Sequence, residues 1–198
     1  RQLGYAIKHL GIARQTAGGI ELRVHPTLVP ETCLIAGVNG VSNAVMVNAD
    51  AVGTTLFYGP GAGSEPTASS VIADIVDVAR TMRSSPESWV PALGCVPSAL
   101  QSQNILDIQD IETSFYIRFS AFDQAGVLSS VTKIMGDTGI SIEAIIQREQ
   151  PAGEEYVDVI ILTNVTKEKF LDEAVELIEK LATVRGRVNF IRVEHLDQ

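Results

Sequence analysis

Residues 116–149, YIRFSAFDQAGVLSSVTKIMGDTGISIEAIIQRE, decide the fold of the second half of the chain. Phe115–Phe119 has the apolar and aromatic composition of a strand, and Gly126–Met135 carries its apolar residues at helical spacing. Apolar and polar residues then alternate over 140–146, which is typical of a second strand. The stretch therefore predicts a strand, a helix and a strand in succession.

The residues that follow extend this order. YVDVIILT, residues 156–163, predicts a third strand after a turn at 150–155. Lys167–Leu181 predicts a second helix and Val188–Val193 a last strand. The order βαββαβ is the split βαβ pattern of ferredoxin-like folds. We therefore expect an α+β protein in which residues 113–198 form such a unit.

The first 30 residues predict a helix end followed by a hairpin. Apolar residues at helical spacing in 1–10 predict a helix that Gly11 closes, and Gly18-Gly19 predicts a turn back to residues 12–15. In GIELRVHPTLVP, residues 19–30, apolar residues at 20, 22 and 24 alternate with polar ones at 21, 23 and 25. This alternation predicts a half-buried strand with its polar face in water, ended by Pro26 and Pro30.

Residues 31–112 predict a second hairpin, a helix and a linker. VSNAVMV and AVGTTLFYG flank a turn at 48–50, so residues 12–58 predict a largely antiparallel sheet. Thr67–Met82 has the apolar periodicity of a helix, and residues 83–112, with several prolines and serines, read as a linker. We divide the chain into 1–82, 83–112 and 113–198.

Composition excludes several classes of protein. The net charge of −9 without a basic stripe argues against a nucleic-acid surface, and no apolar run is long enough to span a membrane. Cys33 and Cys95 lack metal-ligand spacing and are expected to be reduced thiols, which fits the cytoplasm; we expect no metal site. The chain begins with Arg1 inside a periodic pattern, so we expect it to be a piece of a longer protein.

Two short motifs are candidates for ligand binding. In FDQAGVLSSV, residues 122–131, Asp123 ends a predicted strand and Gly126 opens a helix. A small amino acid would place its carboxylate at the helix N-terminus and its ammonium near Asp123; alternatively, Asp123 only caps the helix. In YGPGAGSEPTASS, residues 58–70, a glycine-rich turn feeds a helix, which fits either a cofactor contact or a plain tight turn. We interpret His25 as a packed or capping residue rather than a base.

The segment around FDQAGVL resembles an ACT domain, the small ligand-binding module of amino-acid-pathway enzymes, over about residues 114–195. The family usually has Asp-x-Pro-Gly-Val-Leu at this turn, and Ala125 replaces the proline here. The resemblance implies an amino-acid effector and side-by-side pairing into a dimer or tetramer. The residues that it implies for effector binding are Asp123, Gly126, Val127 and Leu128.

The first 82 residues resemble the C-terminal part of the catalytic domain of homoserine dehydrogenase. The resemblance rests on LGYAIKHLGIA, on GIELRVHPTLVP and on residues 39–80, where Tyr-Gly-x-Gly-Ala-Gly precedes Pro-Thr-Ala-Ser. It implies an NAD- or NADP-dependent oxidoreductase that interconverts L-homoserine and L-aspartate 4-semialdehyde in threonine, methionine and isoleucine biosynthesis. Threonine is the implied feedback effector.

The same resemblance implies where the chemistry lies. Gly63, with Gly61 and Ala62, would contact the cofactor. The family's catalytic lysine and nucleotide-binding fold precede this segment, so no catalytic residue is assigned within the chain and Lys8 is not the catalytic lysine. We expect the 198 residues alone to be inactive. The alternative is a non-enzymatic amino-acid-sensing or dimerisation module.

Overall fold

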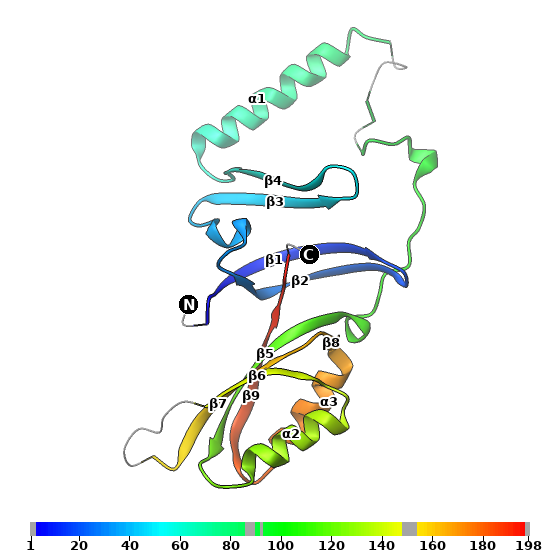
Figure 1. Cartoon of the computed structure of the whole chain (residues 1–198). Helices are drawn as coiled ribbons and strands as arrows, with labels where there is room; N and C mark the ends of the chain where they lie inside the picture. The colour runs from blue at the N-terminus through cyan, green and yellow to red at the C-terminus, as the bar shows by residue number, and fades with distance from the viewer. Residues whose placement is uncertain (1–2, 86–89, 92, 148–153, 197–198) are drawn as a thin grey trace. The chain divides into compact units, whose positions relative to one another are not determined.

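The computed structural model describes residues 3–85, 90–91, 93–147 and 154–196 (Figure 1). They fall into two compact units. The first unit combines the residues up to Ala36 with Asn104–Leu196, and the second unit comprises Gly37–Gln103. Among the residues described, no helix is both long and apolar enough to cross a bilayer.

The first unit is built on a seven-stranded sheet with the order β1-β2-β9-β5-β7-β6, in which β8 also pairs with β5. Its strands are β1 (Tyr5–Thr16), β2 (Gly19–Pro30), β5 (Glu112–Phe122), β6 (Ile142–Gln147), β7 (Tyr156–Thr163), β8 (Thr166–Lys167) and β9 (Val184–Val193). Helices α2 (Val127–Asp137) and α3 (Glu168–Glu179) follow β5 and β8. β5 pairs antiparallel with both β7 and β9, and β6 pairs antiparallel with β7. The predicted βαββαβ unit is confirmed, with β8 as a short addition.

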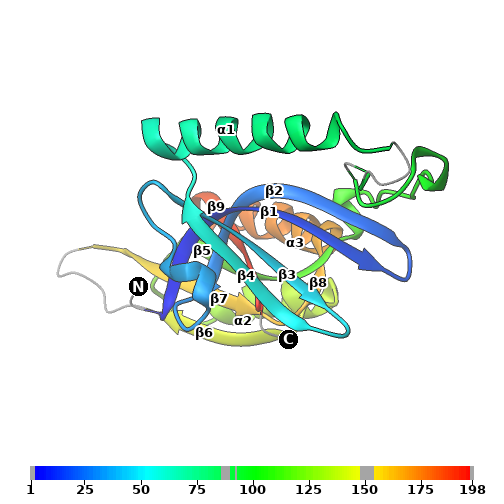
Figure 2. The same ribbon diagram turned by 90° about the horizontal axis from the view of Figure 1, so that it is seen from above.

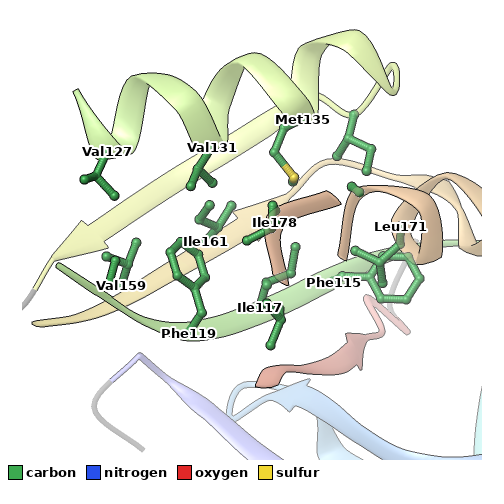
Figure 3. Packing of buried hydrophobic residues seen from close by; sticks show 14 of the residues in the cluster. Phe115, Ile117, Phe119, Val127, Val131, Met135, Val159, Ile161, Leu171 and Ile178 are labelled. Atoms are coloured by element: carbon green, nitrogen blue, oxygen red, sulfur yellow. The ribbon is translucent and has the colours of Figure 1, made fainter. Parts of the chain in front are cut away.

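The core of this unit lies between the two helices and the sheet (Figure 3). Val127, Val131 and Met135 recur every four residues along α2 and are all buried, so one helical face points at the strands. From the sheet, Phe115 and Phe119 on β5 are at most 1% exposed. Burial of each such side chain stabilises the fold by roughly 1.5–3 kcal/mol.

The prediction of a helix end in residues 1–10 is wrong where these residues are described, because residues 5–10 belong to strand β1. β1 pairs antiparallel with β2 through twelve residue pairs, from Tyr5 opposite Pro30 to Thr16 opposite Gly19 (Figure 2). This long ladder provides hydrogen-bond partners for the backbone N–H and C=O groups between the two strands. Its stabilisation outweighs the local preference for a helix that the spacing of apolar residues suggests. The predicted hairpin through Gly18-Gly19 is confirmed, with β2 starting at Gly19.

The prediction that the polar face of β2 lies in water is also wrong. Leu22 and Val24 are 52% and 73% exposed, whereas the residues between and beside them, Glu21, Arg23 and His25, are 3%, 5% and 7% exposed. The charged face of β2 can be buried because Arg23 forms ion pairs with Glu21 and Glu194.

Pro26 does not end β2, which continues to Pro30. Counting from the hydrogen-bonded pair that closes the two-residue turn, Pro26 falls in a non-hydrogen-bonded pair with His9, so its missing N–H removes no bond to β1.

The second unit contains β3 (Ser42–Ala49), β4 (Gly53–Pro60) and helix α1 (Ser64–Thr81). β3 and β4 form a two-stranded sheet of their own, so the predicted single antiparallel sheet over 12–58 is wrong. Among the described strands, β3 and β4 pair only with each other, whereas β2 pairs along its whole length with β1 and at two positions with β9. The hairpin turn lies at 50–52, two residues beyond the predicted position.

The predicted helix is confirmed as α1, although it starts at Ser64 rather than Thr67. Gly63 serves as its N-cap and Pro66 lies in its first turn, where a missing N–H removes no intrahelical bond. No residue of α1 is buried. The predicted linker is irregular where it is described, with 3-10 turns at Pro97–Ala99 and Ile108–Asp110. The predicted turn at 150–155 lies largely outside the described residues.

Candidate functional site

A hollow of about 170 Å³ opens at the end of β5, where α2 begins. β5 and β6 both run antiparallel to β7, so their C-terminal ends lie at the same edge of the sheet. We call this the β5–β6 hollow. Its lining residues are Ala121, Phe122, Asp123, Gln124, Ala125, Gly126, Val127, Leu128, Gln147, Val157 and Val159. The four residues predicted for effector binding, Asp123, Gly126, Val127 and Leu128, are thus brought together.

Asp123 does not cap α2, so that alternative interpretation is wrong. The N-cap is Gly126, which makes no side-chain cap bond, and the Asp123 carboxylate instead accepts a hydrogen bond from Gln147 Nε2 at 3.2 Å. The exposed Asp123 carboxylate therefore forms one wall of the hollow.

The backbone conformation at position 126 favours glycine. Its φ of +94° and ψ of −17° lie in the left-handed region, which L side chains rarely adopt. This conformation turns the chain from β5 into α2 within a few residues, so the first turn of the helix faces the hollow. The first-turn N–H groups and the positive end of the helix dipole favour an anion there.

The β5–β6 hollow combines the groups that recognise a small zwitterion. The Asp123 carboxylate suits an ammonium group, the N-terminus of α2 suits a carboxylate, and Val127, Val157 and Val159 form an apolar floor. Its volume is below the roughly 300–1,000 Å³ of pockets for drug-sized ligands, so it suits a small metabolite.

Gln147 is the residue that the sequence interpretation missed. It is the last residue of β6, and its side-chain amide reaches the Asp123 carboxylate from 24 positions away in sequence. The βαββαβ topology contained the signal, because that topology places the ends of its first two strands at one edge of the sheet.

The glycine-rich turn before α1 is exposed, and the local structure favours glycine at positions 61 and 63 for two different reasons. Gly61 donates its N–H to the Val41 carbonyl at 3.0 Å, and a Cβ there would lie 1.5 Å from the Asn43 side-chain nitrogen. Gly63, at φ +131°, caps α1 without a side-chain hydrogen bond. Ala62 lies between them. The turn therefore presents backbone to solvent at the start of a helix.

His25 is a packed residue, as expected, and lies 7% exposed on β2. Lys8 is half-buried on β1. Over the described part of the chain, no group of three or more His, Cys, Asp or Glu side chains is placed to hold a metal ion.

Comparison with known proteins gives two matched segments, whose bounds lie close to the predicted division into 1–82, 83–112 and 113–198. Residues 1–76 match the family model of homoserine dehydrogenase, and residues 115–183 match the model of the ACT domain. The homoserine dehydrogenase of Pseudomonas aeruginosa is 53% identical over 98% of this chain and 45% of its own length. That of Neisseria gonorrhoeae is 46% identical, with the same coverage.

Solved structures agree with these matches. The crystal structure of a homoserine dehydrogenase from Thiobacillus denitrificans superimposes with a TM-score of 0.88 at 51% identity, over 98% of this chain and 43% of that one. The chain thus spans less than half the length of the relatives that it matches.

Proposed function

Because the chain belongs to the homoserine dehydrogenase family, we propose that it forms part of an NAD- or NADP-dependent enzyme that interconverts L-homoserine and L-aspartate 4-semialdehyde. The relatives from Pseudomonas aeruginosa and Neisseria gonorrhoeae are both homoserine dehydrogenases, and each aligns with 98% of the chain. We assign residues 1–82 to the catalytic and dimerisation domain, 83–112 to a linker and 113–198 to a regulatory ACT domain. The pathway is that of threonine, methionine and isoleucine, in the cytoplasm.

Within this enzyme, the turn before α1 forms one wall of the cofactor site. The backbone at Gly61, Ala62 and Gly63 is exposed, and Gly63 leaves the start of α1 without a side-chain cap. Such a helix start suits the negative charge of a nicotinamide dinucleotide. The catalytic lysine and the main nucleotide-binding fold come from residues outside these 198.

The second half of the chain binds an amino-acid effector, and the β5–β6 hollow carries this assignment. Asp123 receives the ammonium group, and Gly126, Val127 and Leu128 at the start of α2 receive the carboxylate end. Threonine, an end product of the pathway, is the preferred effector. A dimer or tetramer completes the assembly, as pairing of ACT domains implies.

Calorimetric titration with threonine, methionine and isoleucine tests the effector site. We expect Asp123→Asn to weaken binding by about tenfold or more, because a hydrogen bond to a charged group contributes roughly 1.5–3 kcal/mol. The matched control is Asp137→Asn, at the other end of α2, whose carboxylate pairs with Lys133 in solvent. Equal affinity in both variants would place the effector elsewhere.

Turnover distinguishes the enzyme from the alternative, an amino-acid-sensing or dimerisation module. We expect no oxidation of NADPH by the 198-residue chain with aspartate semialdehyde. Turnover by this chain would show that it holds a complete active site. The alternative has its own support, since every residue that lines the hollow lies within the segment that matches the ACT model. Effector binding by a longer homologous protein without dehydrogenase activity would favour it.

A further inference from the structure

A cluster of charged side chains, buried except for Arg14, whose side chain is 44% exposed, lies at the opposite end of β5 from the β5–β6 hollow. Glu194, just after β9, accepts hydrogen bonds from Arg14 on β1 and Thr113 on β5, both at 3.1 Å, and pairs with Arg23 on β2. Glu21 pairs with Arg14 at 3.5 Å and with Arg23 at 3.7 Å. The Arg23 side chain is 0% exposed, and those of Glu21 and Glu194 are 4% exposed.

This cluster bridges a seam where few backbone bonds hold the β1–β2 hairpin to the rest of the sheet. β2 pairs with β9 at only two positions, Thr27 with Arg192 and Leu28 with Val193. The Glu194 N–H adds a hydrogen bond to the Leu28 carbonyl at 2.9 Å. A small apolar cluster around Val29 and Cys33, which Leu196 contacts, lies beside the seam.

His25 extends the cluster in a way that requires a neutral ring. Its Nε2 lies 3.3 Å from Arg23 Nη1, and its Nδ1 lies 2.9 Å from Thr27 Oγ1 and 3.2 Å from the Pro26 carbonyl. A guanidinium group only donates, so Nε2 must accept and the ring proton belongs on Nδ1. A second proton, on Nε2, would turn that nitrogen into a donor facing the Arg23 donor and would place two cations side by side.

Charged side chains lie on each strand that neighbours His25. On β1, Leu10 lies directly opposite, flanked on the same face by Lys8 and Ile12, with Arg14 one pair beyond. β2 contributes Arg23 and Glu21, and the β9 end contributes Glu194 and Arg192, which pairs with Glu168 of α3. The cations are Lys8, Arg14, Arg23 and Arg192, against the carboxylates Glu21, Glu168 and Glu194. A protonated His25 adds to the cationic excess.

These surroundings lower the pKa of His25. Burial is the main cause, and the charges of Arg192 and Arg23 add to it, while the Pro26 carbonyl and Glu194 oppose it. His25 therefore takes up a proton less readily when the β1–β2 hairpin is docked on β9 than when the hairpin has separated from β9. The stability of docking is complete above a pH of about 6.5 and falls as the pH drops toward the lowered pKa.

We propose that Arg14, Glu21, Arg23, Glu194 and His25 form a proton-sensitive latch, which holds the β1–β2 hairpin on β9 while His25 is neutral and releases it when His25 is protonated. The hairpin belongs to the segment that matches the dehydrogenase model, whereas β5 lies in the segment that matches the ACT model. The latch thus controls whether these two segments share one sheet.

Amide hydrogen exchange followed by NMR between pH 5 and 8 tests the latch in the 198-residue chain. The reporter is the Glu194 N–H, whose acceptor is the Leu28 carbonyl. After correction for the intrinsic exchange rate at each pH, we expect its protection to fall below pH 6.5 by up to about tenfold per pH unit. Protection of the β7 amides should not change, because β9 and β5 lie between β7 and the seam.

Three variants separate the latch from a general effect of acid. His25→Gln keeps an acceptor for Arg23 but takes up no proton, so the pH step should disappear. His9→Gln changes an exposed histidine on the neighbouring strand, and the step should remain. Glu194→Gln leaves two guanidinium groups with only Glu21, so protection should fall roughly a hundredfold or more at every pH.

The latch is refuted if the wild-type chain shows no pH step at Glu194 N–H, if the step survives in His25→Gln, or if β7 loses protection in parallel. The ring signals of the wild-type chain provide a second measurement should His25→Gln fail to fold. His25 must titrate below the usual histidine value of 6.5, because its pKa is lowered in the docked hairpin. A midpoint at or above 6.5 for the His25 ring overturns the proposal.

Discussion

The same substitution just before α2 and in its last turn should have opposite effects on stability. Gly126 precedes the helix with φ +94°, and Gly136 lies inside its last turn with an ordinary negative φ. A Cβ added at either position meets no atom within 4 Å. Gly126→Ala and Gly136→Ala therefore differ in backbone conformation and not in steric fit.

The magnitude follows from that difference. Replacement of glycine by alanine restricts the unfolded chain, which favours the folded state by about 0.4–1 kcal/mol at both positions. At Gly126, alanine also adopts a left-handed conformation, which costs about 1–2 kcal/mol. The free energy of unfolding should rise by about 0.5–1 kcal/mol in Gly136→Ala and fall by about 0.5–1.5 kcal/mol in Gly126→Ala. The gap between the two variants isolates the backbone strain.

Urea unfolding followed by far-ultraviolet circular dichroism measures both variants against the wild-type chain. The slope of the transition should be unchanged, so that a shift in midpoint reports stability alone. The reasoning is refuted if Gly126→Ala is as stable as the wild type, or if both variants shift in the same direction. Effector titration of Gly126→Ala adds a functional reading, because the strained residue borders the β5–β6 hollow.

Three further predictions concern packing and charge. Ile178→Ala, at a position that is 0% exposed, should destabilise the chain by about 2–5 kcal/mol in the same urea assay; a loss below 1 kcal/mol would contradict its place in the core. Gly61→Ala should cost at most about 1 kcal/mol, because the Asn43 amide is the tip of an exposed side chain that can turn away from the added methyl group, and Asn43→Ala in the same chain should recover most of this cost; an additive double variant would argue against this clash. A hydrogen bond from Lys169, together with its charge, lowers the pKa of Asp110, so the stabilising contribution of this carboxylate exists above its usual pKa of 3.8 and disappears as the pH falls below it. Asp110→Asn should therefore lower the melting temperature slightly at pH 6 and leave it unchanged near pH 2, and an equal shift at both pH values would exclude the ion pair.

The sequence by itself determined the elements whose apolar period and boundaries are local. Val127, Val131 and Met135 mark the buried face of α2, and Gly126 marks its start. The βαββαβ order followed from these local patterns, and it implied that Asp123 would lie at the edge where β6 also ends. The candidate effector residues were therefore within reach of the sequence, whereas the contact of Gln147 with Asp123 required the sheet order.

Only the tertiary structure decided the conformation and burial of residues 3–30. Leu22 and Val24 look like an inward face, yet they are exposed, and the charged residues Glu21 and Arg23 are buried. A strand shows which residues share a face but not which face is covered. The covering partner here is Glu194, more than 160 positions away in sequence, whose carboxylate makes burial of Arg23 possible. Pairing with β2 also placed residues 5–10 in a strand, because a backbone ladder of twelve residue pairs outweighs a short helical spacing.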